Sequence, residues 1–358
     1  MESGKGSKID VFRVGQARPM PNYITHTKEE LQEAYTRMMR IRKGEEKIRE
    51  LQTTEPGTLH QWVHSSEGEE ACCVGVAMAM RLGDLQTGDV LEGTHRSHGY
   101  PIAMGVDLKA WMAELFAKAT GTNKGRGGTM HLADVSIGMM GSNSIVGMCV
   151  KPVGAAMVFK MRGSDQVGIS ITGDGGTNNG TFLEALNLAS IHDLPVVFVV
   201  NNNQFQVGTP AWLDNACLRK GGNISDRADG FAMMGVTIDG NDFFEVNKAA
   251  KYCIERARKG EGPSLLELVT YRQRSHCYTE FPHEVNMWPA ENPDELAYWL
   301  RKDPIRRFER EVLDGNLMTQ EELDAIRKQV DREIEEAVEF ARKSPFPDPE
   351  EVYRDIYA

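Results

Sequence analysis

The sequence contains few cysteines, and none of them stands in a CxxC pair. The six are Cys72, Cys73, Cys149, Cys217, Cys253 and Cys277. A disulfide scaffold needs a denser and more regular set, and a zinc site needs closely spaced Cys or His ligands. The pattern therefore excludes both classes and predicts reduced thiols in a cytosolic protein.

Long apolar runs and blocks of basic residues are also missing. The longest apolar stretch, residues 194–200, is far shorter than the roughly 18 residues of a membrane span. The 41 basic residues are outnumbered by 52 acidic ones, which gives a net charge of −11. Nucleic acid and anionic membranes are therefore excluded as partners. The first residues show no apolar signal segment, so we expect a cytoplasmic protein, with the mitochondrial matrix as the weaker alternative.

The centre of the chain alternates predicted strands and helices. The strands are residues 167–172, 195–200, 236–238 and 264–270, and the helices are residues 181–192 and 244–259. Strands joined through helices form βαβ units, which build parallel sheets covered by helices on both faces. The sequence thus predicts an α/β fold with a doubly wound, mostly parallel sheet.

The flanking regions predict further helices. Residues 27–51 have helical spacing after a threonine cap, and residues 67–81 are small and apolar, typical of a buried helix. Residues 89–105, which include THRSHGY, are predicted to be a polar, histidine-rich loop. We divide the chain into an N-terminal arm (1–26), one ligand-binding domain (27–292) and a helical C-terminal extension packed on it (293–358).

Two polar loops follow strands of the same βαβ unit: GDGGTNNG at 173–180 and NNNQF at 201–205. Ligands of open α/β sheets bind beyond the carboxyl ends of the strands, so both loops should face one crevice. Glycines and a helix N-terminus let backbone N–H groups approach an anion. Asp174, Asn203 and the Phe205 carbonyl offer hard oxygen ligands for Mg²⁺ or Ca²⁺. A GDG alone is a common turn, but with the Asn pair after the next strand it predicts a divalent ion clamped to a diphosphate.

These loops belong to a longer series of ordered blocks that resembles a known family. The blocks include EGEEACCVG, THRSHGYPIAMG, ATGTNKGRGGTMHL, ISDRADGFAM and GEGPSLLELVTYR. Together they resemble the α subunit of the thiamine-diphosphate-dependent 2-oxo acid dehydrogenase E1 family, which includes the pyruvate, branched-chain and acetoin enzymes. Residues 27–292 would then be the domain that binds the diphosphate of this cofactor.

The resemblance implies a set of ligands for thiamine diphosphate and its metal ion. The cofactor ligands would be Arg96, Ser144, Val146, Asp174, Gly175, Gly176, Asn203 and His276, and the metal ligands Asp174, Asn203 and the Phe205 carbonyl. Gly175 and Gly176 would meet the diphosphate through backbone amides, and Arg96 would supply positive charge. Ser144 and Val146 would touch the aminopyrimidine.

The resemblance also implies that His276, in RSHC, lies over the cofactor and is the catalytic candidate of this chain. Each assignment has an ordinary structural alternative: Arg96 as part of an exposed loop, and His276 as a structural histidine. Cys277 replaces the serine that is phosphorylated in animal pyruvate and branched-chain enzymes, and Asn201 replaces an acid usual in the family. The unusual loop at 273–286 leaves the substrate open.

The implied function is oxidative decarboxylation of a pyruvate-like 2-oxo acid with acyl transfer to lipoamide. A required glutamate and the pyrimidine-binding domain would come from an E1 β subunit, in an α₂β₂ assembly served by a lipoyl-bearing E2. Two alternatives remain: a subunit of an acetoin-type dehydrogenase that cleaves acyloins or diketones, and a non-catalytic paralogous subunit.

Overall fold

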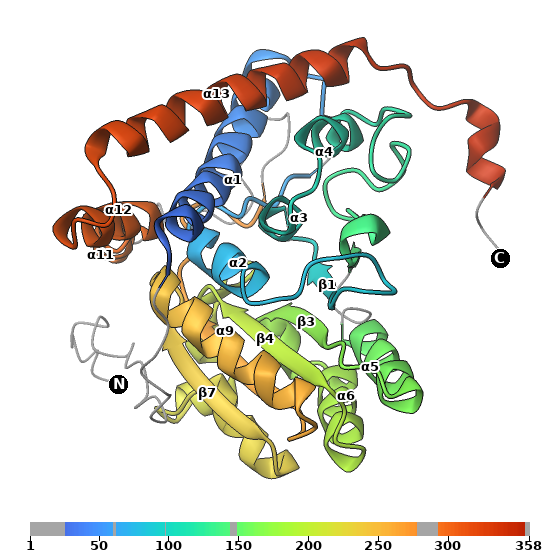
Figure 1. Ribbon diagram of the computed structural model, residues 1–358, viewed down its shortest axis with the longest axis vertical. Helices are drawn as coiled ribbons and strands as arrows, with labels where there is room; N and C mark the ends of the chain where they lie inside the picture. Colours follow the sequence, from blue (N-terminus) through green and yellow to red (C-terminus); the bar gives the residue numbers. More distant parts are fainter. Residues whose placement is uncertain (1–25, 60–61, 97, 144–148, 278–292, 355–358) are drawn as a thin grey trace, which may run out of the picture.

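Six parallel strands form the central sheet of the computed structural model, which describes residues 26–59, 62–96, 98–143, 149–277 and 293–354 (Figure 1). Their order is β2-β1-β3-β4-β8-β7. The strands are β1 (Val90–Thr94), β2 (Met139–Asn143), β3 (Gly168–Gly173), β4 (Val196–Asn202), β7 (Met234–Asp239) and β8 (Ser264–Val269). The predicted parallel α/β sheet is therefore confirmed, including all four predicted strands.

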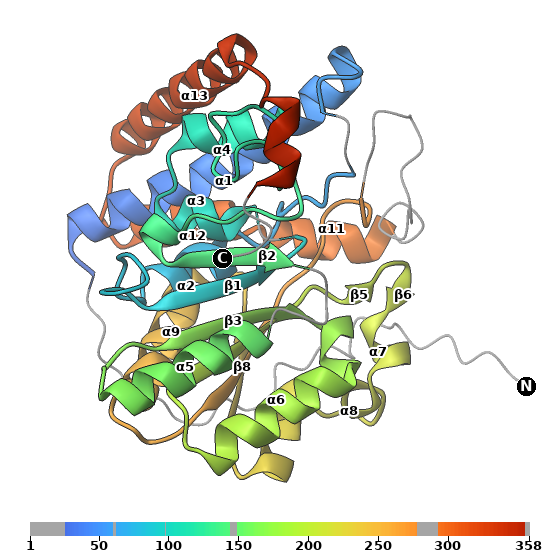
Figure 2. The ribbon, with the colours of Figure 1, turned by 90° about the vertical axis from the view of Figure 1, so that its right-hand side faces the viewer.

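Helices cover both faces of the sheet. Along β4, Val197 and Val199 join the large core with α1 (Lys28–Thr54), α2 (Glu70–Ala77) and α9 (Phe243–Arg258). The alternate residue Phe198 faces α5 (Val150–Arg162) and α6 (Gly180–Ile191), which lie in front of the sheet in Figure 2. Because both faces are buried, this strand reads as a continuous apolar run, PVVFVV, without polar alternation.

Helix α1 begins as its sequence predicts. The Thr27 hydroxyl accepts from the Glu30 N–H while the Glu30 carboxylate accepts from the Thr27 N–H, a capping box that satisfies two otherwise unpaired donors. The predicted helix at 67–81 is shorter, because α2 covers only Glu70–Ala77, and every residue in it is buried.

The prediction of a loop over residues 89–105 is wrong for most of its length. That segment contains strand β1 and helix α3 (Gly99–Met104). β1 was hidden by the buried Glu92, whose carboxylate accepts from Lys151 Nζ at 2.8 Å, and by Gly93 beside it. A charge and a glycine break the apolar pattern by which buried strands are found. The described residues between β1 and α3, which include Arg96, belong to neither a strand nor a helix.

Helix α4 (Leu108–Leu115) organises the glycine-rich loop that follows it. The carboxylate of Glu114 accepts hydrogen bonds from four backbone N–H groups of that loop, at 2.6–3.1 Å. The donors are Asn123, Gly125, Gly127 and Gly128. This buried carboxylate satisfies donors that would otherwise lack partners in a turn without regular structure.

The C-terminal part is helical, as predicted: α11 (Pro293–Arg301), α12 (Pro304–Asp314) and α13 (Gln320–Lys343). α13 crosses α1 and α4 (Figure 1), and its Ile334 and Val338 belong to the main core. Arg42 of α1 pairs with Glu70 at 2.6 Å and with Asp303 at 2.8 Å, so it ties this part to α2. Residues 1–25 and 278–292 lie outside the described residues, and the division at 26/27 and 292/293 stays a prediction.

No helix among the described residues has the length and apolar character needed to cross a membrane. All six cysteines fall within the described residues, and none of them is paired.

Candidate active site

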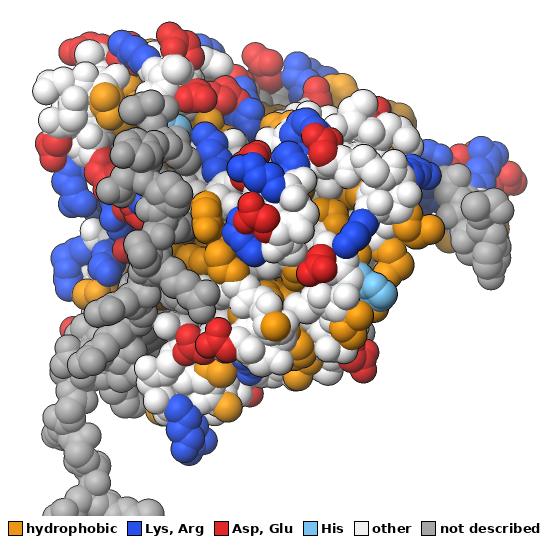
Figure 3. All heavy atoms as spheres, turned by 60° about the horizontal axis from the view of Figure 1, so that its bottom comes forward, with side chains coloured by type: hydrophobic (Ala, Val, Ile, Leu, Met, Phe, Trp, Pro, Cys, Tyr) orange, Lys and Arg blue, Asp and Glu red, His pale blue; other side chains and the backbone are white. Residues whose placement is uncertain are grey.

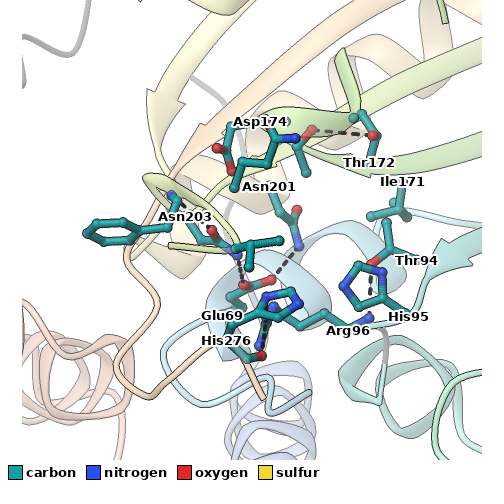
Figure 4. A pocket seen from close by; sticks show the side chains of 16 residues that line it. Glu69, Thr94, His95, Arg96, Ile171, Thr172, Asp174, Asn201, Asn203 and His276 are labelled. Atoms are coloured by element: carbon teal, nitrogen blue, oxygen red, sulfur yellow. Dashed lines mark hydrogen bonds between the residues drawn. The ribbon is translucent and has the colours of Figure 1, made fainter. Parts of the chain in front are cut away.

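A crevice opens at the carboxyl ends of β1, β3 and β4, where the winding of the sheet changes direction between β1 and β3 (Figure 4). Its walls include Arg96 after β1, Asp174 to Gly176 after β3, Asn203 and Phe205 after β4, and His276 after β8. Six of the eight residues predicted to bind the cofactor therefore line one cavity, as do all three predicted metal ligands. Ser144 and Val146 lie outside the described residues.

The side chain of Asp174 lines this crevice with a carboxylate oxygen that can still accept a ligand. The side chain is 2% exposed, and its Oδ2 has no hydrogen-bond partner among the described residues. Burial raises the pKa of Asp174 to about 7. A buried, unpartnered carboxylate oxygen costs free energy unless a ligand engages it.

Gly175 is required by the close approach of the two loops. A Cβ at this position would come within 2.6 Å of the Gln206 side chain, which crosses over it after β4. Glycine thus lets the loop after β3 and the loop after β4 meet, and both Gly175 and Gly176 line the crevice. The turn is held from outside by Arg227, which donates to Asn178 Oδ1 at 2.6 Å.

Asn203 is oriented by a glutamate that sequence reasoning did not identify. The Glu69 carboxylate accepts from Asn203 Nδ2 at 2.8 Å and from Asn201 Nδ2 at 2.9 Å (Figure 4). Asn201 Oδ1 in turn accepts from the Tyr100 hydroxyl at 2.9 Å. Because a carboxylate accepts but does not donate, the amide nitrogen of Asn203 must face Glu69, and its oxygen points away from that partner.

The oxygen atoms that these hydrogen bonds leave available are suited to a hard divalent cation. They are the Asp174 carboxylate, Asn203 Oδ1 and the main chain of Phe205, all of them oxygen ligands of the kind that Mg²⁺ and Ca²⁺ prefer. Among the described residues, Asn203 Oδ1 accepts only a long 3.4 Å contact from the Phe205 N–H. The unpartnered Asp174 Oδ2 is the feature that best matches a bound cation.

Arg96 is buried at the crevice rather than exposed on a loop, which decides against its structural alternative. Its Nη1 donates to the Ser65 carbonyl at 2.9 Å, and its Nη2 donates to the His276 carbonyl at 2.7 Å. The guanidinium therefore brings positive charge to an otherwise acidic protein at the predicted place.

His276 belongs to a cluster of three imidazoles. Its ring lies 4.7 Å from that of His64 and 5.8 Å from that of His95, both edge-on. Burial, with the charge of Arg96, lowers the pKa of His276 to about 3 and that of His95 to about 4. Both rings are therefore neutral near pH 7.

A second buried arginine, Arg272, was not identified from the sequence. It is 1% exposed, and its guanidinium lies 5.2 Å from the centre of the Phe205 ring. Burial and the charge of Arg96 lower the pKa of Arg272 to about 9. In the sequence it is one of two arginines in YRQRSH, and Arg274 instead pairs with Glu67 at 2.9 Å.

Comparisons with known proteins give the same family. The model of the dehydrogenase E1 component family matches residues 36–350. The α subunit of acetoin:2,6-dichlorophenolindophenol oxidoreductase from Bacillus subtilis is 41% identical over 93% of this chain and 95% of its own length. The corresponding subunit from Cupriavidus necator is also 41% identical, over 92% and 95%. The α subunit of the pyruvate dehydrogenase E1 component of Porphyra purpurea is 33% identical over 94% and 95%.

The parallel sheet and the paired loops at its carboxyl edge are those of a thiamine-diphosphate-dependent enzyme. The chain belongs to the dehydrogenase E1 component family, as an α-type component of a 2-oxo acid dehydrogenase. The predicted family, fold class and enzyme class are confirmed, and thiamine diphosphate follows from the family.

Proposed function

We propose that this chain binds thiamine diphosphate and Mg²⁺ as the α subunit of an α₂β₂ E1 enzyme. The enzyme would oxidatively decarboxylate a pyruvate-like 2-oxo acid and pass the acyl group to lipoamide on an E2. The observation that carries the metal is the buried, unpartnered Oδ2 of Asp174 beside the oriented amide of Asn203. The six unpaired cysteines support a cytoplasmic location.

In this proposal the ligands divide between metal and diphosphate. Asp174, Asn203 Oδ1 and the Phe205 carbonyl hold the cation, and the N–H groups of Gly175 and Gly176 meet the phosphate oxygens. Arg96, which also lines the crevice, contributes positive charge. Ser144 and Val146 are proposed to contact the aminopyrimidine.

Bound thiamine diphosphate supplies a nucleophilic carbon and an electron sink for decarboxylation. Residues of this chain exclude water from the crevice and orient the substrate. We assign His276 to the substrate side, where its neutral ring contacts the carboxylate or carbonyl oxygen. A positioned donor that stabilises negative charge on such an oxygen contributes typically about 10²–10³-fold to kcat.

A β subunit would cover an apolar face that this chain leaves exposed. Six large hydrophobic side chains are exposed on α5 and α6, namely Val150, Val158, Met161, Leu183, Leu188 and Ile191. Figure 3 shows hydrophobic side chains gathered on the side where these helices lie. α6 starts immediately after the turn that carries Asp174, so a partner seated on this face would also reach the crevice. Exposed apolar side chains gathered on one side of a protein are typical of an interaction site.

An acetoin-type acyloin or diketone dehydrogenase is the second candidate function. Two relatives named for acetoin oxidation are 41% identical, whereas a pyruvate dehydrogenase relative is 33% identical. The same cofactor site serves both reactions, so a panel of pyruvate, branched 2-oxo acids and acetoin decides between them.

The proposal is tested by native mass spectrometry of the complex isolated with Mg²⁺, followed by the substrate panel. We expect an α₂β₂ mass with two thiamine diphosphates. His276→Ala should keep that assembly and lose at least 10²-fold in turnover. A cofactor-free homo-oligomer that stays empty after addition of thiamine diphosphate and Mg²⁺ would refute cofactor binding. Turnover of His276→Ala within about threefold of the wild type would refute the role of the histidine.

A further inference from the structure

Two guanidinium groups converge on one nitrogen of the His276 ring. Nδ1 lies 3.3 Å from Nη2 of Arg96 and 3.4 Å from Nη1 of Arg272. The two arginines come from different parts of the sheet edge, one after β1 and the other after β8. The arrangement is therefore set by the fold and not by neighbours in the sequence alone.

The chemistry of arginine decides the proton on His276. A guanidinium has five N–H donors and no acceptor, and it stays protonated in proteins. Nδ1 must therefore be the acceptor of both contacts and cannot carry a proton itself. A neutral imidazole has one N–H, which then lies on Nε2. The low pKa of this ring is consistent with the neutral form.

Arg272 is held so that it cannot turn away from the ring. Nη2 donates to the Val207 carbonyl at 2.8 Å, and Nε donates to the Arg274 carbonyl at 3.1 Å. One face of the guanidinium lies over the Phe205 ring. Arg96 is fixed in the same way by the carbonyls of Ser65 and His276. Fixed donors of this kind orient a functional histidine without touching the substrate.

We propose that Arg272 is a positioning residue that, together with Arg96, holds His276 as the Nε2–H tautomer, so that the ring offers the crevice a hydrogen-bond donor. A neutral imidazole held in this way polarises a carbonyl oxygen or stabilises a developing negative charge on it, as a neutral histidine does in other enzymes. It does not act as a base through Nε2. The consequence for catalysis rests on the proposed function, but the tautomer itself does not.

The same geometry argues against a metal site at this histidine. Ligand atoms of His64, His276 and Cys277 lie within 4.8 Å of one another, a grouping that resembles a site for a thiophilic ion. A neutral histidine binds a metal through an unprotonated nitrogen. In His276 one nitrogen accepts from two arginines and the other carries the proton. The inference therefore predicts that Zn²⁺ does not bind here.

The test is a long-range ¹H–¹⁵N spectrum of the full chain labelled on histidine, near pH 7.5. Its signals are assigned to His276 by comparison with His276→Gln. We expect a protonated Nε2 and an unprotonated Nδ1. In Arg272→Met we expect the two tautomers to mix, while Arg274→Met, which removes a neighbouring arginine that pairs with Glu67, should leave the signals unchanged. With a β partner, Arg272→Met should lower kcat about 10- to 100-fold and change KM less than threefold, and Arg272→Lys should recover part of that loss.

Several results would overturn the inference. A proton on Nδ1, or a doubly protonated ring at pH 7.5 in the wild type, excludes it directly. Stoichiometric Zn²⁺ binding that shifts the His276 signals and is lost in Cys277→Ser also excludes it. If Arg272→Met does not fold, the spectrum of the wild type alone decides. If no substrate is turned over, the proposed function fails while the tautomer result stands.

Discussion

Glu69 and Asn203 share a hydrogen bond of 2.8 Å in which the amide nitrogen donates to the carboxylate. This contact settles which end of the Asn203 amide faces the crevice. The oxygen becomes available to a cation because the nitrogen is already engaged. A residue at the start of α2, which touches no proposed reacting atom, thus sets the orientation of a proposed metal ligand.

Glu69→Gln should therefore weaken Mg²⁺ binding. A glutamine keeps one acceptor but replaces the other with an NH₂ donor, so Asn203 can turn its oxygen inward toward it. We expect a 10- to 100-fold rise in the Mg²⁺ dissociation constant, measured by titration in the presence of thiamine diphosphate. Glu267→Gln is the matched control, because that buried carboxylate accepts from Asn202 at 2.7 Å and faces no proposed metal ligand. Unchanged affinity in Glu69→Gln would contradict the orienting role.

Asn201→Asp should destabilise the chain in a pH-dependent way. The new carboxylate would face Glu69, whose pKa is already raised by burial. Two buried like charges raise each other's pKa above the unfolded value, so stability falls as pH rises from about 4 through the folded pKa. Chemical denaturation between pH 4 and pH 8 measures this loss.

The double variant Glu69→Gln with Asn201→Asp should restore the hydrogen bonds that each single substitution disrupts. The introduced glutamine would accept from Asn203 and donate to the introduced carboxylate, which would still accept from the Tyr100 hydroxyl. We expect the double variant to recover most of the stability lost in Asn201→Asp and most of the Mg²⁺ affinity lost in Glu69→Gln. Additive losses in the double variant would show that the three side chains are not coupled.

Asp174→Asn should stabilise the chain without ligands and abolish its response to metal. Burial raises the pKa of Asp174 to about 7, from an unfolded value near 4. The wild type therefore loses stability as pH rises between those values, on the order of 2–4 kcal/mol by pH 8. The variant removes this cost, so its unfolding free energy should be higher at pH 8 and nearly equal at pH 4. Thiamine diphosphate with Mg²⁺ should raise the melting temperature of the wild type but not that of the variant. A rise in the melting temperature of Asp174→Asn would contradict the assignment of Asp174 as a metal ligand.

Arg42→Ala should lower the free energy of unfolding far more than Arg40→Ala, which changes a residue only two positions away on the same helix. Removal of Arg42 leaves the buried carboxylates of Glu70 and Asp303 without their shared partner. This should lower the free energy of unfolding by about 3–5 kcal/mol. Arg40 pairs with the partly exposed Glu333, a contact worth about 1 kcal/mol or less. Urea unfolding of both variants compares them, and equal losses would refute the structural role of Arg42.

Met161→Asp and Ile191→Asp should prevent assembly with the β subunit and leave the isolated chain folded. Both side chains are exposed, at 81% and 64%, so a charge there has little effect on folding. Tyr353→Asp is the control, since that side chain is equally exposed at 81% but lies near the C-terminus. Size-exclusion chromatography of co-expressed chains gives the result, and normal α₂β₂ formation by both variants would place the partner elsewhere.

The sequence predicted the parts of the site that directly follow apolar strands. Asp174 and Asn203 could be placed because β3, with its alternating isoleucines, and β4, with its apolar run, are recognisable as strands, and the carboxyl ends of parallel strands share one edge. Glu69 could not, because nothing in EGEE separates it from Glu70, which instead pairs with Arg42. In YRQRSH, Arg272 and Arg274 likewise look equivalent, although one is buried and the other faces Glu67. Only tertiary packing distinguishes such neighbours. β1 was missed for a related reason, since the ion pair that makes Glu92 tolerable comes from Lys151, far along the chain.

The carboxylate of Glu114, surrounded by four backbone N–H groups, gives the glycine-rich loop after α4 a structural role. Converging amides around a negative group are the means by which glycine-rich loops capture phosphates. Here the protein supplies its own anion, covalently attached and buried, so these four N–H groups are already engaged and do not bind a phosphate. What resembles a receptor for a diffusible ligand is an internal structural contact, and the glycine-rich turn that carries Asp174 is the one proposed to bind an anion.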